Sequence, residues 1–157
     1  MIRTTKTIEV FAPISTVYNQ WTQFEEFPRF MEGIKEVRQL SNTELFWRAN
    51  IDGKEKTWTA VITEQQPDKV IAWRSTSGAQ NDGRVTFEAL DSVTTRLTLQ
   101  LEYHPDGFIE TMGDMIGLVS IRISEDLARF RDYIEAQGHE TGGWRGTIEK
   151  EREIGGS

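Results

Sequence analysis

The feature that most constrains the fold is a long stretch, residues 44–104, in which apolar and polar residues alternate with a period of two. Such alternation is typical of β-strands that bury one face. Asp52-Gly53 lies between two of these alternating segments, 44–51 and 54–65. Because a two-residue type I′ turn needs positive φ angles at both central positions, this dipeptide predicts a hairpin and fixes its register.

Counting outward from this turn places Trp47 directly opposite Trp58 on one face of an antiparallel sheet. The next turn, at 66–69, has proline at the position that a type I turn prefers, and pairing across it brings Trp73 onto the same face. Because alternate residues of a strand share a face, we expect the three tryptophans to project from one side of the sheet.

Three charged residues of these strands are candidates for chemistry. Arg48 and Arg74 fall on the face opposite the tryptophans, where we expect them to be solvated or paired with carboxylates. Glu64 lies at the end of its strand beside a turn, which favours a position at the rim of the sheet.

The remaining pattern predicts the other elements. Met112 opens a series of apolar residues at steps of three and four, which predicts a long helix over 112–137 with Gly138 as its left-handed cap. We expect strands at 3–10, 34–40, 84–90 and 94–104, a helix from Pro13, a second short helix interrupted by Pro28, and a loop at 78–83. The fold class is therefore α+β, in the order β-α-α-β6-α, with an antiparallel sheet of about seven strands curled round one long C-terminal helix.

We expect one domain, residues 1–138, which is an ordinary length for a single hydrophobic core. Residues 139–157 are rich in glycine and charge, which predicts an extended or partly disordered tail. Within this tail we expect the segment 144–146 to fold back on the domain.

Composition excludes several classes of function. A net charge of −7 argues against nucleic-acid binding, because that affinity depends on Lys and Arg. The chain has no cysteine and two histidines without metal-ligand spacing, so we expect no disulfide, thiol nucleophile, metal or cofactor. No window reads as a signal peptide or a membrane span, so we expect a cytoplasmic protein.

Several long stretches of the chain resemble a known family. They are FPRFMEGI at 27–34, WTAVITEQQPDKVIAWRSTSG at 58–78, VTFEAL at 85–90, TRLTLQLEYHPDG at 95–107 and DLARFRDYIEAQGHETGGWRG at 126–146. Together they resemble the START/polyketide-cyclase/birch-allergen-like (SRPBCC) superfamily, in its bacterial polyketide cyclase/dehydrase branch, and are similar to coenzyme Q-binding START-domain proteins. The resemblance implies a helix-grip fold with an apolar cavity between the sheet and the long helix.

With this resemblance, we expect the chain to bind a small hydrophobic molecule: a lipid, an isoprenoid or quinone, or a polyketide-like compound. The candidate ligand-binding residues are Phe27, Phe30, Met31, Trp47, Trp58, Trp73, Phe87, Tyr103, Met112, Met115, Ile116 and Val119. For each ring, ordinary core packing is the alternative.

Two other functions stay open. A cyclase or dehydratase would use the same cavity, with Tyr103 or Asp114 assisting proton transfer. A protein-interaction module would use the acidic outer face. The sequence does not predict an oligomeric state.

Overall fold

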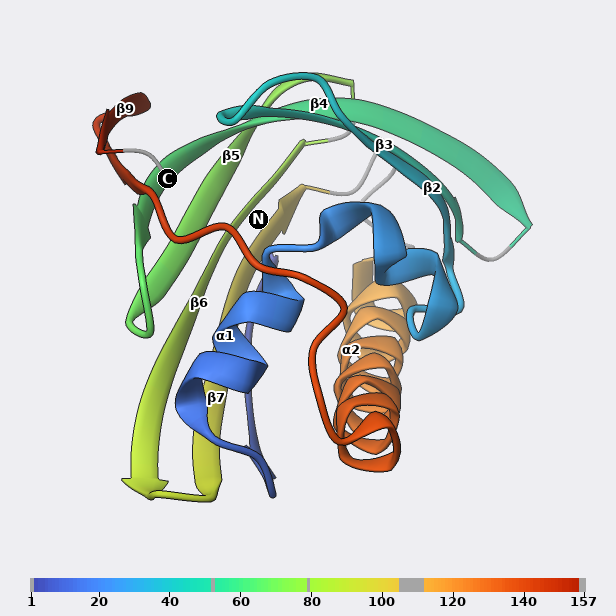
Figure 1. Ribbon diagram of the computed structural model, residues 1–157. Helices are drawn as coiled ribbons and strands as arrows, with labels where there is room; N and C mark the ends of the chain where they lie inside the picture. Colours follow the sequence, from blue (N-terminus) through green and yellow to red (C-terminus); the bar gives the residue numbers. More distant parts are fainter. Residues whose placement is uncertain (1, 52, 79, 105–111, 156–157) are drawn as a thin grey trace.

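A curved antiparallel sheet of nine strands is the main layer of the computed structural model, which describes residues 2–51, 53–78, 80–104 and 112–155 (Figure 1). Side chains are described for residues 3–50, 53–78, 81–102 and 122–154. Seven strands follow one another in the order β1-β7-β6-β5-β4-β3-β2, while β8 pairs with β4 and β9 pairs with β8. The helices lie on the concave side of this sheet (Figure 1).

The elements have the following bounds: β1 Ile2–Val10, α1 Ile14–Trp21, the 3-10 helix η1 Phe24–Arg29, β2 Ile34–Gln39, β3 Glu44–Ile51, β4 Lys54–Gln66, β5 Val70–Gly78, β6 Gln80–Asp91, β7 Thr94–His104, α2 Met112–Gln137, β8 Thr147–Glu149 and β9 Arg152–Gly155. The predicted fold class, a curved antiparallel sheet with one long C-terminal helix, is confirmed. Pro28 lies inside η1, as expected for the interrupted second helix.

The register of the central hairpins follows the turns. Ile51 pairs with Lys54 and Trp47 with Trp58, as the two-residue turn predicts. In the next hairpin Gln66 pairs with Val70 rather than with the last residue of the predicted turn, and the register then shifts between Ile62 and Glu64. This irregularity absorbs one residue. Because of it Ile62 still pairs with Trp73, and the tryptophan keeps its expected face.

The prediction of a loop at 78–83 is wrong for residues 80–83, because β6 begins at Gln80. Asp82 pairs with Arg74 and Gly83 pairs with Trp73, so the ladder runs through the polar residues that suggested a turn. Gly78, with φ of 80°, is the only residue of the described part of that segment with a turn-like backbone. The other glycine of the segment, Gly83, lies against the Trp73 ring.

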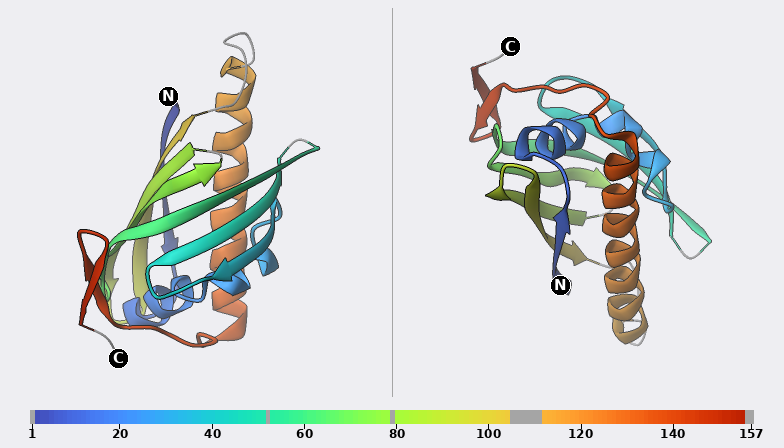
Figure 2. Two further views of the ribbon diagram at one scale, coloured as in Figure 1. Left: turned by 90° about the horizontal axis from the view of Figure 1, so that it is seen from above. Right: turned by 60° about the horizontal axis from the view of Figure 1, so that its bottom comes forward.

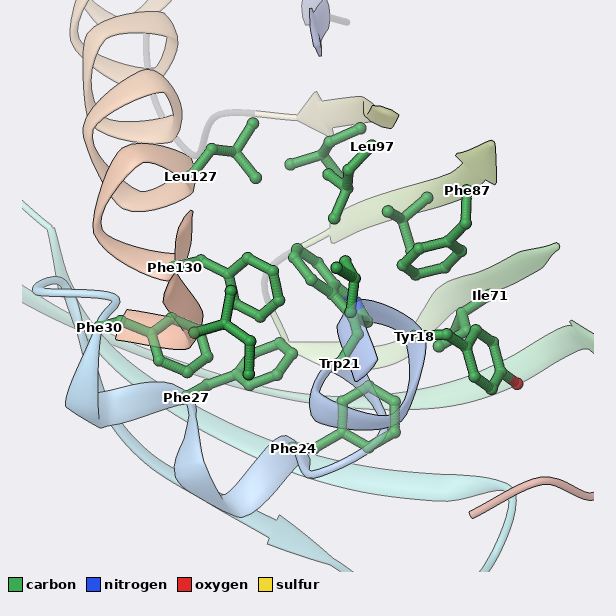
Figure 3. Packing of buried hydrophobic residues seen from close by; sticks show 14 of the residues in the cluster. Tyr18, Trp21, Phe24, Phe27, Phe30, Ile71, Phe87, Leu97, Leu127 and Phe130 are labelled. Atoms are coloured by element: carbon green, nitrogen blue, oxygen red, sulfur yellow. The ribbon is translucent and has the colours of Figure 1, made fainter. Parts of the chain in front are cut away.

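Aromatic rings from both short helices fill the space between the sheet and the C-terminal half of α2 (Figure 3). Trp21 is the centre of this core, with ring centroids 5.3 Å from Phe27, 5.1 Å from Phe130 and 6.5 Å from Phe87. Those partners come from η1, α2 and β6. The Trp21 ring therefore joins three elements that lie far apart in the sequence, and it is only 2 % exposed.

The helix α2 ends where the sequence predicts. Its stripe of Leu127, Phe130 and Ile134 is buried against the main core. Gly138 has φ of 77°, and its amide donates to the carbonyl of Ile134 at 3.0 Å. This is the left-handed cap expected after the last turn.

Beyond Gly138 the chain turns back past α1 and reaches the sheet at β8 and β9 (Figure 2). The Gln20 side chain makes two hydrogen bonds with Thr141: it donates to the hydroxyl at 3.1 Å and accepts from the amide at 2.9 Å. The amide of Trp144 donates to the Thr22 hydroxyl at 3.0 Å. The predicted fold-back of 144–146 is confirmed.

The prediction of an extended or partly disordered tail did not foresee β8 and β9. The strand β8 pairs with β4 at Glu64 and Gln65, beyond the point where β3 covers the same side of β4. Ile148 of β8 is fully buried in the main core. A three-residue strand has too short a pattern to be read from sequence, and its partner depends on where β3 stops along β4.

Truncating Ile148 to alanine should destabilise the fold by about 2–4 kcal/mol, because the side chain is fully buried and would leave a cavity. Ile154 offers a matched control, since it is 60 % exposed and Ile154→Ala should change the free energy of unfolding by less than about 0.5 kcal/mol. Urea unfolding of both variants measures the difference. Equal effects would contradict the docking of β8.

The buried hydroxyl of Tyr18 makes stability depend on pH in the alkaline range. Loss of hydration raises the pKa of Tyr18 to about 12; neighbouring Gln65 and Arg145 oppose this rise and Asp68 adds to it. The hydroxyl has no hydrogen-bond partner of normal geometry among the described residues. Between pH 10 and 12 the unfolded chain loses this proton while the folded chain keeps it, so stability falls as the pH rises.

From pH 9 to pH 11.5 the wild-type protein should therefore lose about 2 kcal/mol more of its free energy of unfolding than Tyr18→Phe does. Other groups titrate in both proteins, so their effects cancel in the comparison. Urea unfolding at the two pH values gives the four free energies. An equal loss in both proteins would show that the Tyr18 hydroxyl keeps an ordinary pKa.

Candidate functional site

The three tryptophans of the central strands lie together on the helix-facing side of the sheet. The rings of Trp47 and Trp58 are stacked, with centroids 5.9 Å apart and planes 6° apart. Together with three smaller apolar residues, the three tryptophans form a group that we call the tryptophan cluster: Ile34, Trp47, Ala49, Trp58, Ala60 and Trp73. Three of its members, Ile34, Trp47 and Trp73, also touch the main core, so the two groups share one face of the sheet.

Trp73 is held in place by its neighbours on β6. Its indole N–H donates to Oδ1 of Asn81 at 3.2 Å, and Asn81 is itself buried. The ring lies flat on Gly83, where an added Cβ would come within 2.1 Å of the ring atom Cζ2. Glycine at this position therefore leaves the space that the indole occupies.

The indoles of this cluster are all more exposed than that of Trp21, which is 2 % exposed. Trp58 is 9 % exposed, whereas Trp47 and Trp73 are half-buried. The indole N–H of Trp47 is itself buried and has no hydrogen-bond partner among the described residues. A group of large rings with small alanines between them is suited to contact with a flat or flexible apolar molecule.

The phenylalanines expected at the site divide between the two groups. Phe27 reaches the tryptophan cluster, with its ring centroid 5.7 Å from that of Trp47. Phe30 packs against Phe130 and Phe87 packs against Tyr18, so both belong to the main core (Figure 3). Met31 is half-buried and also packs against the main core.

The other expected residues lie where the structure describes only the backbone. Tyr103 is on β7, opposite Ile2 and Asn81. The other five belong to the first half of α2: Met112, Asp114, Met115, Ile116 and Val119. The side chains of all six are outside the described residues.

Charged residues of the central strands pair on the outer face. Arg48 contacts Glu36 and Glu55, both at 3.3 Å, and Arg74 is paired with Glu151. These pairs agree with the expected orientation of both arginines, away from the tryptophans. Glu64 pairs with Arg84 at 2.8 Å.

A polar junction between α2 and the η1–β2 connection was missed by the sequence reasoning. Arg129 contacts Asp126 at 2.7 Å and donates through Nε to the carbonyl of Phe30 at 3.1 Å. The amide of Glu32 donates to the Asp126 carboxylate at 3.3 Å. Partial burial raises the pKa of Asp126 while Arg129 opposes the rise. The signal available in the sequence was the spacing of acid and base by three residues on one helix.

Within the part of the chain that the structure describes, no helix combines the length and the apolarity needed to span a membrane.

Comparison with known proteins gives three consistent results. The sequence model of a family described as polyketide cyclase/dehydrase and lipid transport matches residues 10–131. An uncharacterized 17.2 kDa protein of Streptomyces lincolnensis is 44% identical over 149 residues, which cover 94% of this chain and 99% of the relative.

Two solved structures illustrate the shared fold. An aromatase/cyclase of a Streptomyces species matches with a TM-score of 0.74 and 17% identity, over 90% of this chain and 98% of its own. A START superfamily protein from Mycobacterium smegmatis matches with a TM-score of 0.71 and 17% identity, over 84% and 98%. At these identities the similarity shows the fold alone.

Replacing Gly83 with alanine should destabilise the fold by about 1–3 kcal/mol, because the new methyl group would displace the Trp73 ring and its bond to Asn81. A loss of stability would be informative, because alanine is otherwise favoured over glycine inside a strand. Ala89→Val, at an exposed position of the same strand, should stay within about 0.5 kcal/mol of wild type. Chemical unfolding measures both. A neutral or stabilising Gly83→Ala would show that the indole does not need this space.

Proposed function

Because the chain belongs to the polyketide cyclase/dehydrase and lipid-transport family, we propose that it binds a small hydrophobic molecule between the tryptophan cluster and α2. Family and fold support a function of hydrophobic ligand binding or of the polyketide-cyclase type. The proposed ligand is a lipid, an isoprenoid or quinone, or a polyketide-like compound.

The observation that carries this proposal is the partial exposure of large rings on the concave face. Trp21 and Tyr18 of α1, on the same side, are 2 % and 0 % exposed, because both pack against Phe87 of β6 and Trp21 also packs against η1 and α2. Trp47 and Trp73 keep accessible surface although they face the helix layer. Accessible surface on large apolar rings supports an association site at this face.

The proposed ligand contacts follow from the strands and the helix that enclose this face. Trp47, Trp58 and Trp73 supply the central strands' side, where stacking can bind a planar or extended apolar body, and Phe27 of η1 lies beside Trp47. We also propose contacts from Tyr103 of β7 and, on the helix side, from the first half of α2, with Met112, Met115, Ile116 and Val119. Methionine adapts to ligands of different shape because its side chain is unbranched and polarizable.

A cyclase reaction is the second candidate, and the family description supports it. It would need a proton donor or acceptor beside the bound chain, for which Tyr103 and Asp114 are the proposed residues. The tryptophan cluster itself offers contact area and shape. Binding therefore needs fewer assumptions than catalysis, and we put it first.

The proposal predicts that purified protein binds apolar probes, measured by native mass spectrometry and by quenching of tryptophan fluorescence. Suitable probes are dodecanol, laurate and a short-chain ubiquinone. Trp58→Leu should weaken binding about tenfold, or about 1.4 kcal/mol, because it removes half of the stacked pair.

Trp144→Phe is the matched control, because Trp144 lies in the C-terminal segment beside Thr22, and it should leave the affinity unchanged. Circular dichroism confirms that both variants are folded. The proposal fails if no probe and no component of a cell lipid extract binds. It also fails if the two substitutions weaken binding equally.

A further inference from the structure

Arg122 occupies a distinctive position on α2. The side chain is half-buried and lies against the backbone of Gly33, where an added Cβ would be 3.0 Å from Nη1 and 3.4 Å from Cδ. The same Cβ would approach the carbonyl of Asn50, whose amide donates to the carbonyl of Gly33 at 2.8 Å. The guanidinium therefore lies where β2 begins and β3 nears its end.

This place is the border of the tryptophan cluster. Ile34 directly follows Gly33, Ala49 directly precedes Asn50, and these two residues pair across β2 and β3. Both are members of the cluster. A molecule lying on the tryptophans can thus reach the Arg122 guanidinium at the helix side of the same surface.

Arg122 has no ion pair among the described residues. Every other arginine except the exposed Arg152 has a carboxylate within 4 Å. The acid one turn away, Asp126, is 2.7 Å from Arg129, which also contacts Glu32 at 3.5 Å. Arg122 and Asp126 attract each other over a longer distance, but no carboxylate of the described residues lies within 4 Å of this half-buried cation.

A guanidinium that has lost part of its hydration favours an anionic partner, because burial of an unpaired charge is costly. Its planar set of N–H donors matches both oxygens of a carboxylate. We infer that Arg122 binds the carboxylate of an amphipathic ligand whose apolar body lies on the tryptophan cluster. This inference rests on the proposed function, and it narrows the ligand to a monocarboxylate with an apolar chain or ring.

Two probes of equal chain length test it: laurate, which carries a carboxylate, and dodecanol, which does not. Wild-type protein should bind laurate at least tenfold more tightly than dodecanol in isothermal titration. Arg122→Gln should reduce laurate affinity to about that of dodecanol and leave dodecanol affinity unchanged. Arg122→Lys keeps the charge and should retain most of the preference.

Arg131→Gln is the matched control, because Arg131 is on the same helix and pairs with Asp132 at 3.0 Å, and it should change neither affinity. Circular dichroism verifies folding, and Arg122→Met, which also removes the charge, carries the test if the glutamine variant does not fold. If dodecanol binds but laurate has no advantage that depends on Arg122, this inference is overturned and the proposed function stands. If neither probe nor the short-chain ubiquinone binds, both are overturned.

Discussion

The arrangement of the molecule depends on the packing of Trp21 between the sheet and α2. Its ring touches Phe27 of η1, Phe87 of β6 and Phe130 of α2, so one buried side chain sets the separation of three elements. Around it, rings from α1 and η1 fill the concave face beside the C-terminal half of α2 (Figure 3). The surface of Trp47 and Trp73 remains partly accessible, because these strands extend beyond that filling.

The C-terminal segment fastens the same assembly from outside. Gln20 and Thr22, at the end of α1, hold the backbone of Thr141 and Trp144 through their side chains. Arg145 contacts Asp68 at 2.9 Å and so ties this segment to the β4–β5 turn. The short helices are thus held between the core rings on one side and the returning chain on the other.

Much of this could be predicted from the sequence, because a period of two and a two-residue turn together fix both the strands and their register. The shared face of Trp47, Trp58 and Trp73 followed from that register alone. The alternation of a strand predicts which face a side chain lies on but not how deeply it is buried. Phe30 and Phe87 pack into the main core because α2 covers Phe30 and α1 covers Phe87. The pairing of β8 depends on where β3 stops, which no local pattern contains.

The position of Arg122 shows the same limit. Its spacing from Asp126 suggests an ion pair on one helix face, yet Arg129 takes that carboxylate. Only the folded chain shows that Gly33 lies beneath the guanidinium and that the tryptophan cluster adjoins it. An apolar surface bordered by a cation that has no carboxylate of the described residues within 4 Å has the chemistry for an amphipathic ligand.

The central claim is that ligands bind on the tryptophan cluster, and the indole N–H signals in a two-dimensional ¹H–¹⁵N NMR spectrum test it most directly. The chain has five tryptophans, each with one such signal. On addition of laurate, the account predicts shifts for Trp47, Trp58 and Trp73, while Trp21 in the closed core and Trp144 in the C-terminal segment stay in place. Shifts confined to Trp21 or Trp144, or none at all, would contradict it.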